Sequence, residues 1–158
     1  MRIRLAVVLA FAALAFSACA TKSAPAGPAL EARLSAQRWT LQSATDGQGQ
    51  PITALFPRAD SRADPRFTVE FKNGRVGIRG GCNTMGGSYQ IDAASRLQVR
   101  PMMSTRMACA GGLMEADQAL SALLAQRLQV RLDEGPAPVL RLLSDTGQTL
   151  VWTGVPAP

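Results

Sequence analysis

The sequence contains no histidine among its 158 residues, and this absence narrows the chemistry available to it. Without histidine, a cysteine nucleophile lacks its usual base, and a zinc site lacks one of its common ligands. Acidic residues are also few and dispersed, and no pair is marked out for general acid and base roles. Neither a Walker loop nor a GxSxG motif occurs. We therefore expect no enzyme, no catalytic residue and no cofactor.

Aromatic side chains are scarce as well, with one Tyr and two Trp available for base stacking. The arginines are scattered along the chain and form no basic block. Because binding to single strands combines a basic groove with stacking aromatic residues, we expect no nucleic-acid partner. The formal net charge of +6 suits either an ordinary solvated surface or a basic face toward anionic lipid headgroups.

A hydrophobic run long enough to span a membrane is also missing. The unbroken apolar segment Leu5–Phe16 follows Arg2 and Arg4. It is shorter than the roughly 20 apolar residues that a spanning helix needs. A basic start followed by a short apolar core is typical of a signal peptide.

The letters FSAC, residues 16–19, end this run and resemble a bacterial lipobox. That resemblance implies a signal peptide over residues 1–18 and a lipid-modified, palmitate-bearing Cys19. In lipoproteins of this class, the absence of Asp at position 20 implies export to the outer membrane. The alternative is an ordinary secretory signal that is cleaved after Ala18 or Ala20.

Residues 19–35 are rich in Ala, Pro and Gly, and we interpret them as the lipidated cysteine and a flexible tether. A chain with several acyl groups binds a bilayer far more firmly than one with a single acyl group. We expect the membrane as a partner through this N-terminal anchor, on the periplasmic face of the outer membrane.

Two further cysteines, Cys82 and Cys109, remain in the predicted mature chain. In an oxidising envelope compartment such a pair most often forms a disulfide. The chain-entropy estimate for a loop of this length is roughly 3 to 4 kcal/mol of stabilisation. A reactive thiol or a metal pair is the weaker alternative, because no histidine is present.

The remainder is one domain, residues 36–155, whose segments often alternate polar and apolar side chains. The segments that we predict as strands are residues 38–44, 66–71, 75–80, 88–91, 96–101, 127–132, 138–144 and 149–154. Asn73-Gly74 favours a tight hairpin between two of them. Leu113, Leu120 and Leu123 indicate one amphipathic helix within residues 111–126. We therefore predict a mainly β fold, an antiparallel sheet curled into a small barrel or sandwich with one helix.

With these elements in place, the chain resembles the META domain family, also called the heat shock protein HslJ family, over residues 36–152. Residues 47–65 fit less well and look like a lengthened loop. The shared pattern is a Gly-Cys-Asn, a Gly-x-Tyr, a Thr-x-Met-Ala-Cys and an acidic residue in a helix. Besides the two cysteines, it falls on Gly81, Asn83, Gly87, Tyr89, Thr105, Met107, Ala108 and Asp117.

From the anchor and the missing catalytic motifs we expect a non-enzymatic envelope protein that acts by binding or by supporting other envelope components. The resemblance implies heat-shock expression and tolerance to novobiocin-like antibiotics in some members. The main alternative is a carrier or pilot-type chaperone for a lipid or an apolar segment of a partner protein. A filled interior would count against that alternative, and an open apolar groove would favour it.

Two further alternatives concern chemistry. Thioethers are soft ligands that suit Cu(I), and methionines gather near the two cysteines: Met85, Met102, Met103, Met107 and Met114. Methionine also fills irregular core space well, which is the plainer interpretation. A hydrolase would need an exposed polar cluster that the sequence does not indicate.

Overall fold

The computed structural model describes residues 27–57 and 67–157. Its helices are α1 (Pro28–Ser35) and α2 (Leu113–Leu124), with one 3-10 turn, η1 (Thr53–Leu55). Its strands are β1 (Gln37–Thr45), β2 (Thr68–Lys72), β3 (Arg75–Arg79), β4 (Met85–Ile91), β5 (Arg96–Val99), β6 (Met103–Ser104), β7 (Arg127–Asp133), β8 (Val139–Ser144) and β9 (Thr149–Pro156). Every predicted strand is present within a few residues of its expected bounds.

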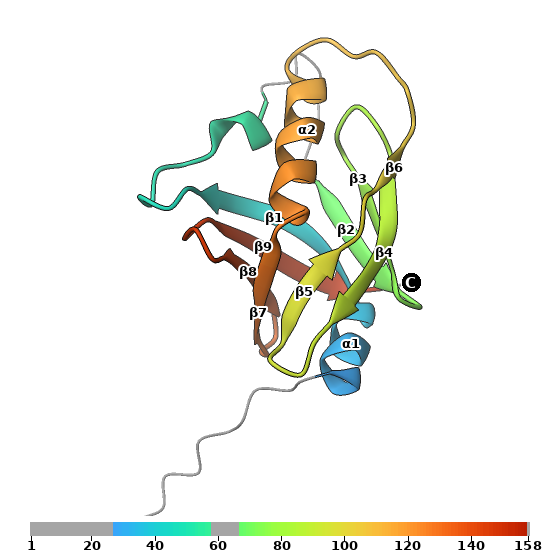
Figure 1. The fold of residues 1–158 in the computed structure, drawn as a ribbon, viewed down its shortest axis with the longest axis vertical. Helices are drawn as coiled ribbons and strands as arrows, with labels where there is room; N and C mark the ends of the chain where they lie inside the picture. The colour runs from blue at the N-terminus through green and yellow to red at the C-terminus, as the bar shows by residue number, and fades with distance from the viewer. Residues whose placement is uncertain (1–26, 58–66, 158) are drawn as a thin grey trace, which may run out of the picture.

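The strands close into an antiparallel barrel (Figure 1). Their order is β3-β2-β1-β9-β8-β7-β5-β4, and an additional pairing between β3 and β4 closes the ring. The short strand β6 pairs only with the start of β4. The prediction of a barrel-like sheet is therefore confirmed. No helix in the described part of the chain combines the length and the apolarity needed to cross a bilayer.

Large apolar side chains fill the interior of the barrel. Trp39 on β1 and Trp152 on β9 are both fully buried. Trp39 is the register partner of Gly154, where a Cβ would lie 2.8 Å from the indole ring. Trp39 Nε1 donates to the Leu34 carbonyl at 3.0 Å, which satisfies the buried indole. An eight-stranded barrel is just wide enough for side chains to fill, and that is the arrangement here.

The predicted helix is α2, which buries Ala116, Leu120, Leu123 and Leu124. In Figure 1 it lies toward the top of the molecule, whereas α1 lies toward the bottom. The structure also places η1 against α2 and buries Leu55 there. The lengthened loop therefore contributes to the core.

Helix α1 corrects the prediction of a flexible tether over residues 19–35, because residues 28–35 are helical and packed against the barrel. Pro28 stands at the first helical position, where its missing N–H costs nothing, and Leu30 and Leu34 form a buried pair four residues apart. The Ala- and Pro-rich composition concealed this short amphipathic helix. The predicted signal peptide and Cys19 lie outside the described residues.

The Asn73-Gly74 turn has the predicted conformation. The φ angles are 52° at Asn73 and 69° at Gly74, as a primed two-residue hairpin requires. This turn fixes the register of β2 and β3, in which Lys72 is opposite Arg75.

Candidate functional site

The two cysteines that remain in the predicted mature chain form a disulfide. Cys82 lies between β3 and β4, Cys109 lies on the segment before α2, and their Cα atoms are 5.7 Å apart. The bond joins the start of β4 to the segment that leads into α2. The disulfide prediction is confirmed in the structure.

Asn83 is the centre of a second link between the same segments. Asp117 Oδ2 on α2 accepts hydrogen bonds from the Asn83 backbone N–H at 2.8 Å and from its side-chain amide at 3.1 Å. Asn83 Oδ1 in turn accepts from Thr105 Oγ1 at 2.9 Å and from the Met107 N–H at 2.8 Å. We call Cys82, Cys109, Asn83, Thr105 and Asp117 the clasp.

Thr105 extends the pairing of β4 with β6 beyond the end of the ladder. The Thr84 N–H donates to Thr105 Oγ1 at 3.1 Å, and the Thr105 N–H donates to the Thr84 carbonyl at 3.1 Å. The threonine hydroxyl thus accepts one bond and donates another to Asn83. A side chain that cannot accept would leave the Thr84 N–H without this partner, and one that cannot donate would leave Asn83 Oδ1 with the Met107 N–H alone.

Gly81 is required by the position of Asp117. A Cβ at Gly81 would overlap Asp117 Oδ1 and would lie 2.6 Å from Phe67 Cε1. Asp117 is only 6% exposed, and within the described residues its Oδ1 atom has no hydrogen-bond partner. The carboxylate is therefore pressed between the helix and the glycine, away from solvent.

Of the other motif residues, Gly87 and Tyr89 lie on β4, apart from the clasp. Ala108 is an exposed residue within the clasp segment, between Met107 and Cys109. Gly87 allows a close approach, since a Cβ there would be 3.2 Å from the Arg100 carbonyl oxygen. The family pattern therefore falls into two groups, the residues in and around the clasp and the two β4 residues Gly87 and Tyr89.

Tyr89 connects the barrel to α1. Its hydroxyl donates to Glu31 Oε1 at 3.1 Å, and its ring meets Phe71 edge to face at a centroid distance of 5.2 Å. Burial, reinforced by the hydrogen bond to Glu31 and by its negative charge, raises the pKa of Tyr89 to about 12. The sequence did not indicate Glu31, because it falls in the segment interpreted as a tether.

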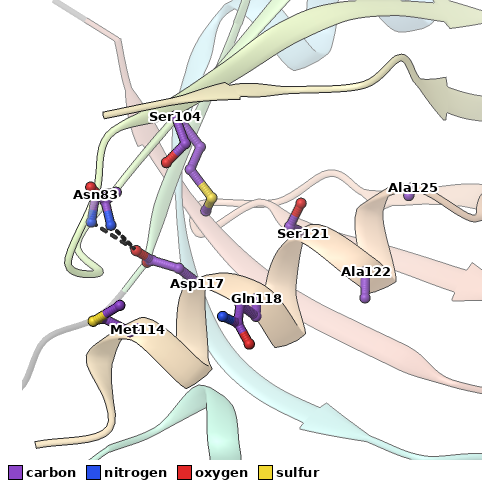
Figure 2. A pocket seen from close by; sticks show the side chains of 9 residues that line it. Asn83, Ser104, Met114, Asp117, Gln118, Ser121, Ala122 and Ala125 are labelled. Atoms are coloured by element: carbon purple, nitrogen blue, oxygen red, sulfur yellow. Dashed lines mark hydrogen bonds between the residues drawn. The ribbon is translucent and has the colours of Figure 1, made fainter. Parts of the chain in front are cut away.

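A cleft of about 500 Å³ opens between α2 and the strands β4 and β6. Figure 2 shows Asn83 and Asp117 at one end and Ala125 at the other. Its lining residues are Asn83, Met85, Ser104, Met114, Asp117, Gln118, Ser121, Ala122 and Ala125. The sequence analysis singled out four of these, Asn83 and Asp117 through the motif and Met85 and Met114 through the methionine cluster. The small and polar residues on α2 gave no signal of their own.

The methionines do not converge on one point. Met85 is a register partner of Ser104 and is 4% exposed, whereas Met103 is a partner of the adjacent Gly86 and is 79% exposed. Adjacent positions on a strand point to opposite faces, so these two thioethers are on opposite sides of the sheet. Within the described residues, no group of three or more His, Cys, Asp or Glu side chains could hold a metal.

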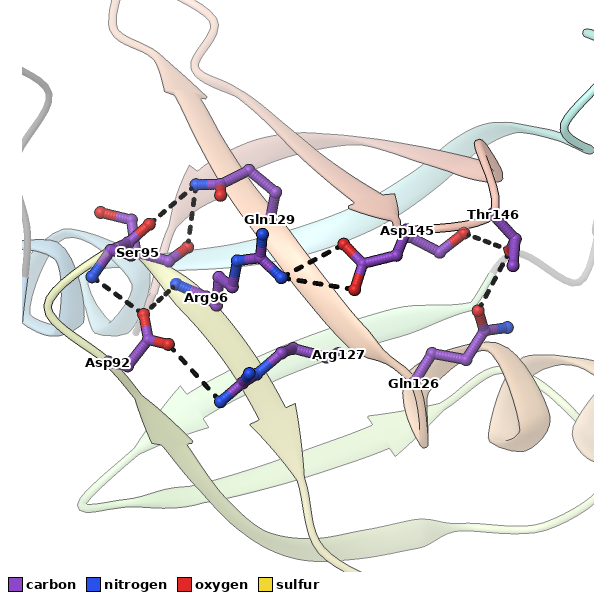
Figure 3. A network of polar contacts seen from close by, with 10 residues as sticks. Asp92, Ser95, Arg96, Gln126, Arg127, Gln129, Asp145 and Thr146 are labelled. Carbon is purple, nitrogen blue, oxygen red and sulfur yellow. Dashed lines mark hydrogen bonds and ion pairs between the residues drawn. The ribbon is translucent and has the colours of Figure 1, made fainter.

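A separate polar network links the β4–β5 turn, the starts of β5 and β7, and the β8–β9 turn (Figure 3). Asp92 Oδ1 accepts from the Arg96 N–H at 2.8 Å, and Asp92 Oδ2 is 3.8 Å from Arg127 Nη2. Arg96 Nη1 also lies 3.2 Å from Asp145 Oδ1. These pairs are largely exposed, so each contributes little to stability, but together they neutralise the arginines.

Comparison with known proteins agrees with this geometry. Among curated proteins, no match to the chain is found. The chain is similar to the NMR structure of a protein from Burkholderia xenovorans, with a TM-score of 0.62 and 25% identity, over 86% of this chain and 93% of that one. The family model of the META domain matches residues 32–155, which include the barrel, the clasp and α2. This chain belongs to the META domain family.

Proposed function

We propose that this META domain protein is held in the bacterial cell envelope by lipid on Cys19 and acts there by binding, without catalysis, in support of other envelope components. The observation that carries this proposal is the use of the motif residues. The polar groups of Asn83 and Thr105 are hydrogen-bonded within the clasp, and the carboxylate of Asp117 is buried. Asn83 and Asp117 stand at one end of the cleft, and the carboxylate there is already bonded to Asn83 and only 6% exposed, which favours a binding role over acid–base chemistry.

The disulfide supports the location in an oxidising compartment. Disulfides persist in the periplasm and outside the cell and are rare in the cytosol. A role in stress or antibiotic tolerance would follow if the protein supports an assembly of the envelope, as the family resemblance implies.

Mass spectrometry of the protein extracted from its own membranes in mild detergent tests this proposal. We expect a triacylated chain that begins at Cys19, in which two thiols accept a label only after reduction. A chain without acyl groups, or thiols that react before reduction, would overturn the proposal. A copper ion that survives native extraction would instead favour the metal-binding alternative.

The cleft favours a second candidate function, the binding of an apolar segment of a partner protein. Met85, Met114, Ala122 and Ala125 provide an apolar lining, whereas the filled barrel counts against a lipid in the interior. Ala122→Trp should fill the cleft and reduce the fluorescence of a bound uncharged apolar dye such as Nile red. Ala29→Trp, at an exposed position of α1, is the matched control. Equal dye binding by the two variants would exclude the cleft as the site that binds apolar ligands.

A further inference from the structure

The outer face of the barrel carries a row of cations across neighbouring strands. Lys72 on β2 is opposite Arg75 on β3, and Arg75 is opposite Ser88 on β4. Arg100 follows β5 and continues this register, since its N–H donates to the Ser88 carbonyl at 2.9 Å. Opposed residues share one face of a sheet at about 5 Å, and all four are exposed. We call Lys72, Arg75, Ser88 and Arg100 the cationic row.

The cations of this row have no carboxylate partner among the described residues, in contrast to many cations elsewhere. The arginines with an ion pair are Arg33, Arg38, Arg96, Arg127 and Arg141. Arg100 Nη2 donates at 3.2 Å to the neutral amide oxygen of Gln90. The positive charge of the row is therefore not compensated from within the described surface.

The arrangement is unfavourable for the isolated fold. Like charges directly opposite each other destabilise a sheet, and Lys72 and Arg75 close the β2–β3 hairpin in this way. A ligand that neutralises them would remove this repulsion. The row thus has the character of a binding surface for anions.

The next row on the same face of the sheet, two residues along each strand, leaves the cations accessible. In it Gly77 is opposite Gly86, and neither has a side chain that could cover the cationic row. The space where a Cβ of Gly77 would stand has no atom within 4 Å. Glu70, on the same row, is bound to Arg38 at 2.6 Å, so its charge is neutralised. The glycines of this neighbouring row therefore leave the cations open to an anionic surface, and the exposed Met103 stands at the far end of the neighbouring row, opposite Gly86.

The cationic row lies at the α1 end of the barrel. Tyr89, next to Ser88, donates its N–H to the Gly74 carbonyl of the hairpin turn and its hydroxyl to Glu31 of α1. Figure 1 shows the β2–β3 turn and α1 at the same end. The N-terminal segment joins the barrel at this end, because α1 begins at Pro28.

We propose that the cationic row docks the α1 end of the barrel onto the anionic headgroups of the membrane that holds the lipid anchor. The orientation rests on the proposed anchor: from Cys19 to Gly27 the chain spans at most about 30 Å, which keeps this end close to the bilayer. Guanidinium groups bind phosphate oxygens in a bidentate manner. Electrostatic attraction acts within a Debye length of about 8 Å, so docking requires contact.

Sedimentation with lipid vesicles tests the docking surface. The chain from Ala20 onward keeps every described residue and the whole core, and it lacks Cys19. We expect it to bind vesicles rich in an anionic phospholipid more strongly than zwitterionic vesicles, and less strongly as salt increases. The variant Arg75→Gln/Arg100→Gln should lower the partition coefficient roughly 25-fold, since each cation near an anionic surface contributes about fivefold.

The matched control is Arg106→Gln/Arg131→Gln, which removes the same charge from exposed arginines outside the row. An equal loss in both variants, or no preference for anionic vesicles, would overturn the proposal. Thermal unfolding should show that both variants stay folded. As Cys19 is absent, this result is independent of the acylation that mass spectrometry measures.

Discussion

At the scale of single residues, the tightest requirement of the clasp is the absence of a side chain at position 81. A methyl group there would overlap Asp117 Oδ1 and crowd Phe67. We predict that Gly81→Ala lowers the free energy of unfolding by about 2 to 3 kcal/mol, because Asp117 must move and release its bonds to Asn83. Urea unfolding measures this loss.

The control is Gly77→Ala, another strand glycine, where the added methyl group meets no atom within 4 Å. Its effect should stay within about 0.5 kcal/mol or be slightly stabilising. If the contact with Asp117 is the cause, Gly81→Ala should cost much less in an Asp117→Ala background. An unchanged cost in that background would mean that another contact is responsible.

Tyr89 offers a direct test of its buried environment because it is the one tyrosine in the chain. Phenolate absorbance should titrate with a pKa of about 12 instead of 10.0. Glu31→Gln should lower this pKa but leave it above 10.0, since burial is the larger cause. Glu70→Gln, on the outer face, should not change it, and a pKa near 10.0 in the unaltered protein would contradict the burial.

The same shift has a consequence for stability. The fold favours the neutral phenol, so the contribution of Tyr89 is complete below pH 10 and is lost as the pH rises from 10 toward 12. Unfolding measurements across this range should show a smaller decline in the Glu31→Gln variant.

At the scale of elements, α1 is part of the folded domain. Leu30 and Leu34 are buried, and the Leu34 carbonyl accepts the Trp39 indole N–H. We predict that a chain beginning at Ala36 is less stable than one beginning at Gly27 by about 3 to 6 kcal/mol, from the two leucine burials alone. Thermal and urea unfolding of the two chains measure the difference.

A third chain that begins at Ala20 provides the comparison for length. It should unfold together with the chain from Gly27 if residues 20–26 add no stabilising contact. Equal stability of the chains from Gly27 and Ala36 would mean that α1 contributes nothing to the core.

The elements that the sequence revealed are those with a repeated signal. The segment Arg127–Asp133 alternates buried and exposed residues, and the Asn73-Gly74 turn permits one tight conformation. Helix α1 has only one apolar pair, Leu30 and Leu34, and Met103–Ser104 is too short to alternate. The cleft could not be predicted, because Ser121 and Ala122 look like ordinary surface residues of a helix. They line a cleft only because the fold places β4 and β6 opposite them.

At the scale of the whole molecule, the two ends of the barrel have different tasks in our proposals. The clasp and α2 shape a cleft at one end, and α1 and the cationic row face the membrane at the other. Strand β4 connects the two, because it carries both Met85 of the cleft and Ser88 of the row. Because a packed core is rigid, docking through the row would hold the cleft at a fixed orientation to the bilayer.

The disulfide joins Cys82 and Cys109 across a separation of 27 residues and sets the stability of the cleft end. We predict that Cys82→Ala/Cys109→Ala lowers the free energy of unfolding by about 3 kcal/mol, mainly because the unfolded chain gains freedom. Reductant should destabilise the unaltered chain from Ala20 to the same extent and leave the variant unchanged.

The hydrogen bonds of Asn83 to Asp117 and Met107 span the same segments, so the cleft should persist without the disulfide, and dye binding below the unfolding transition should be retained. Loss of both dye binding and the folded state would show that the clasp depends on the covalent bond alone.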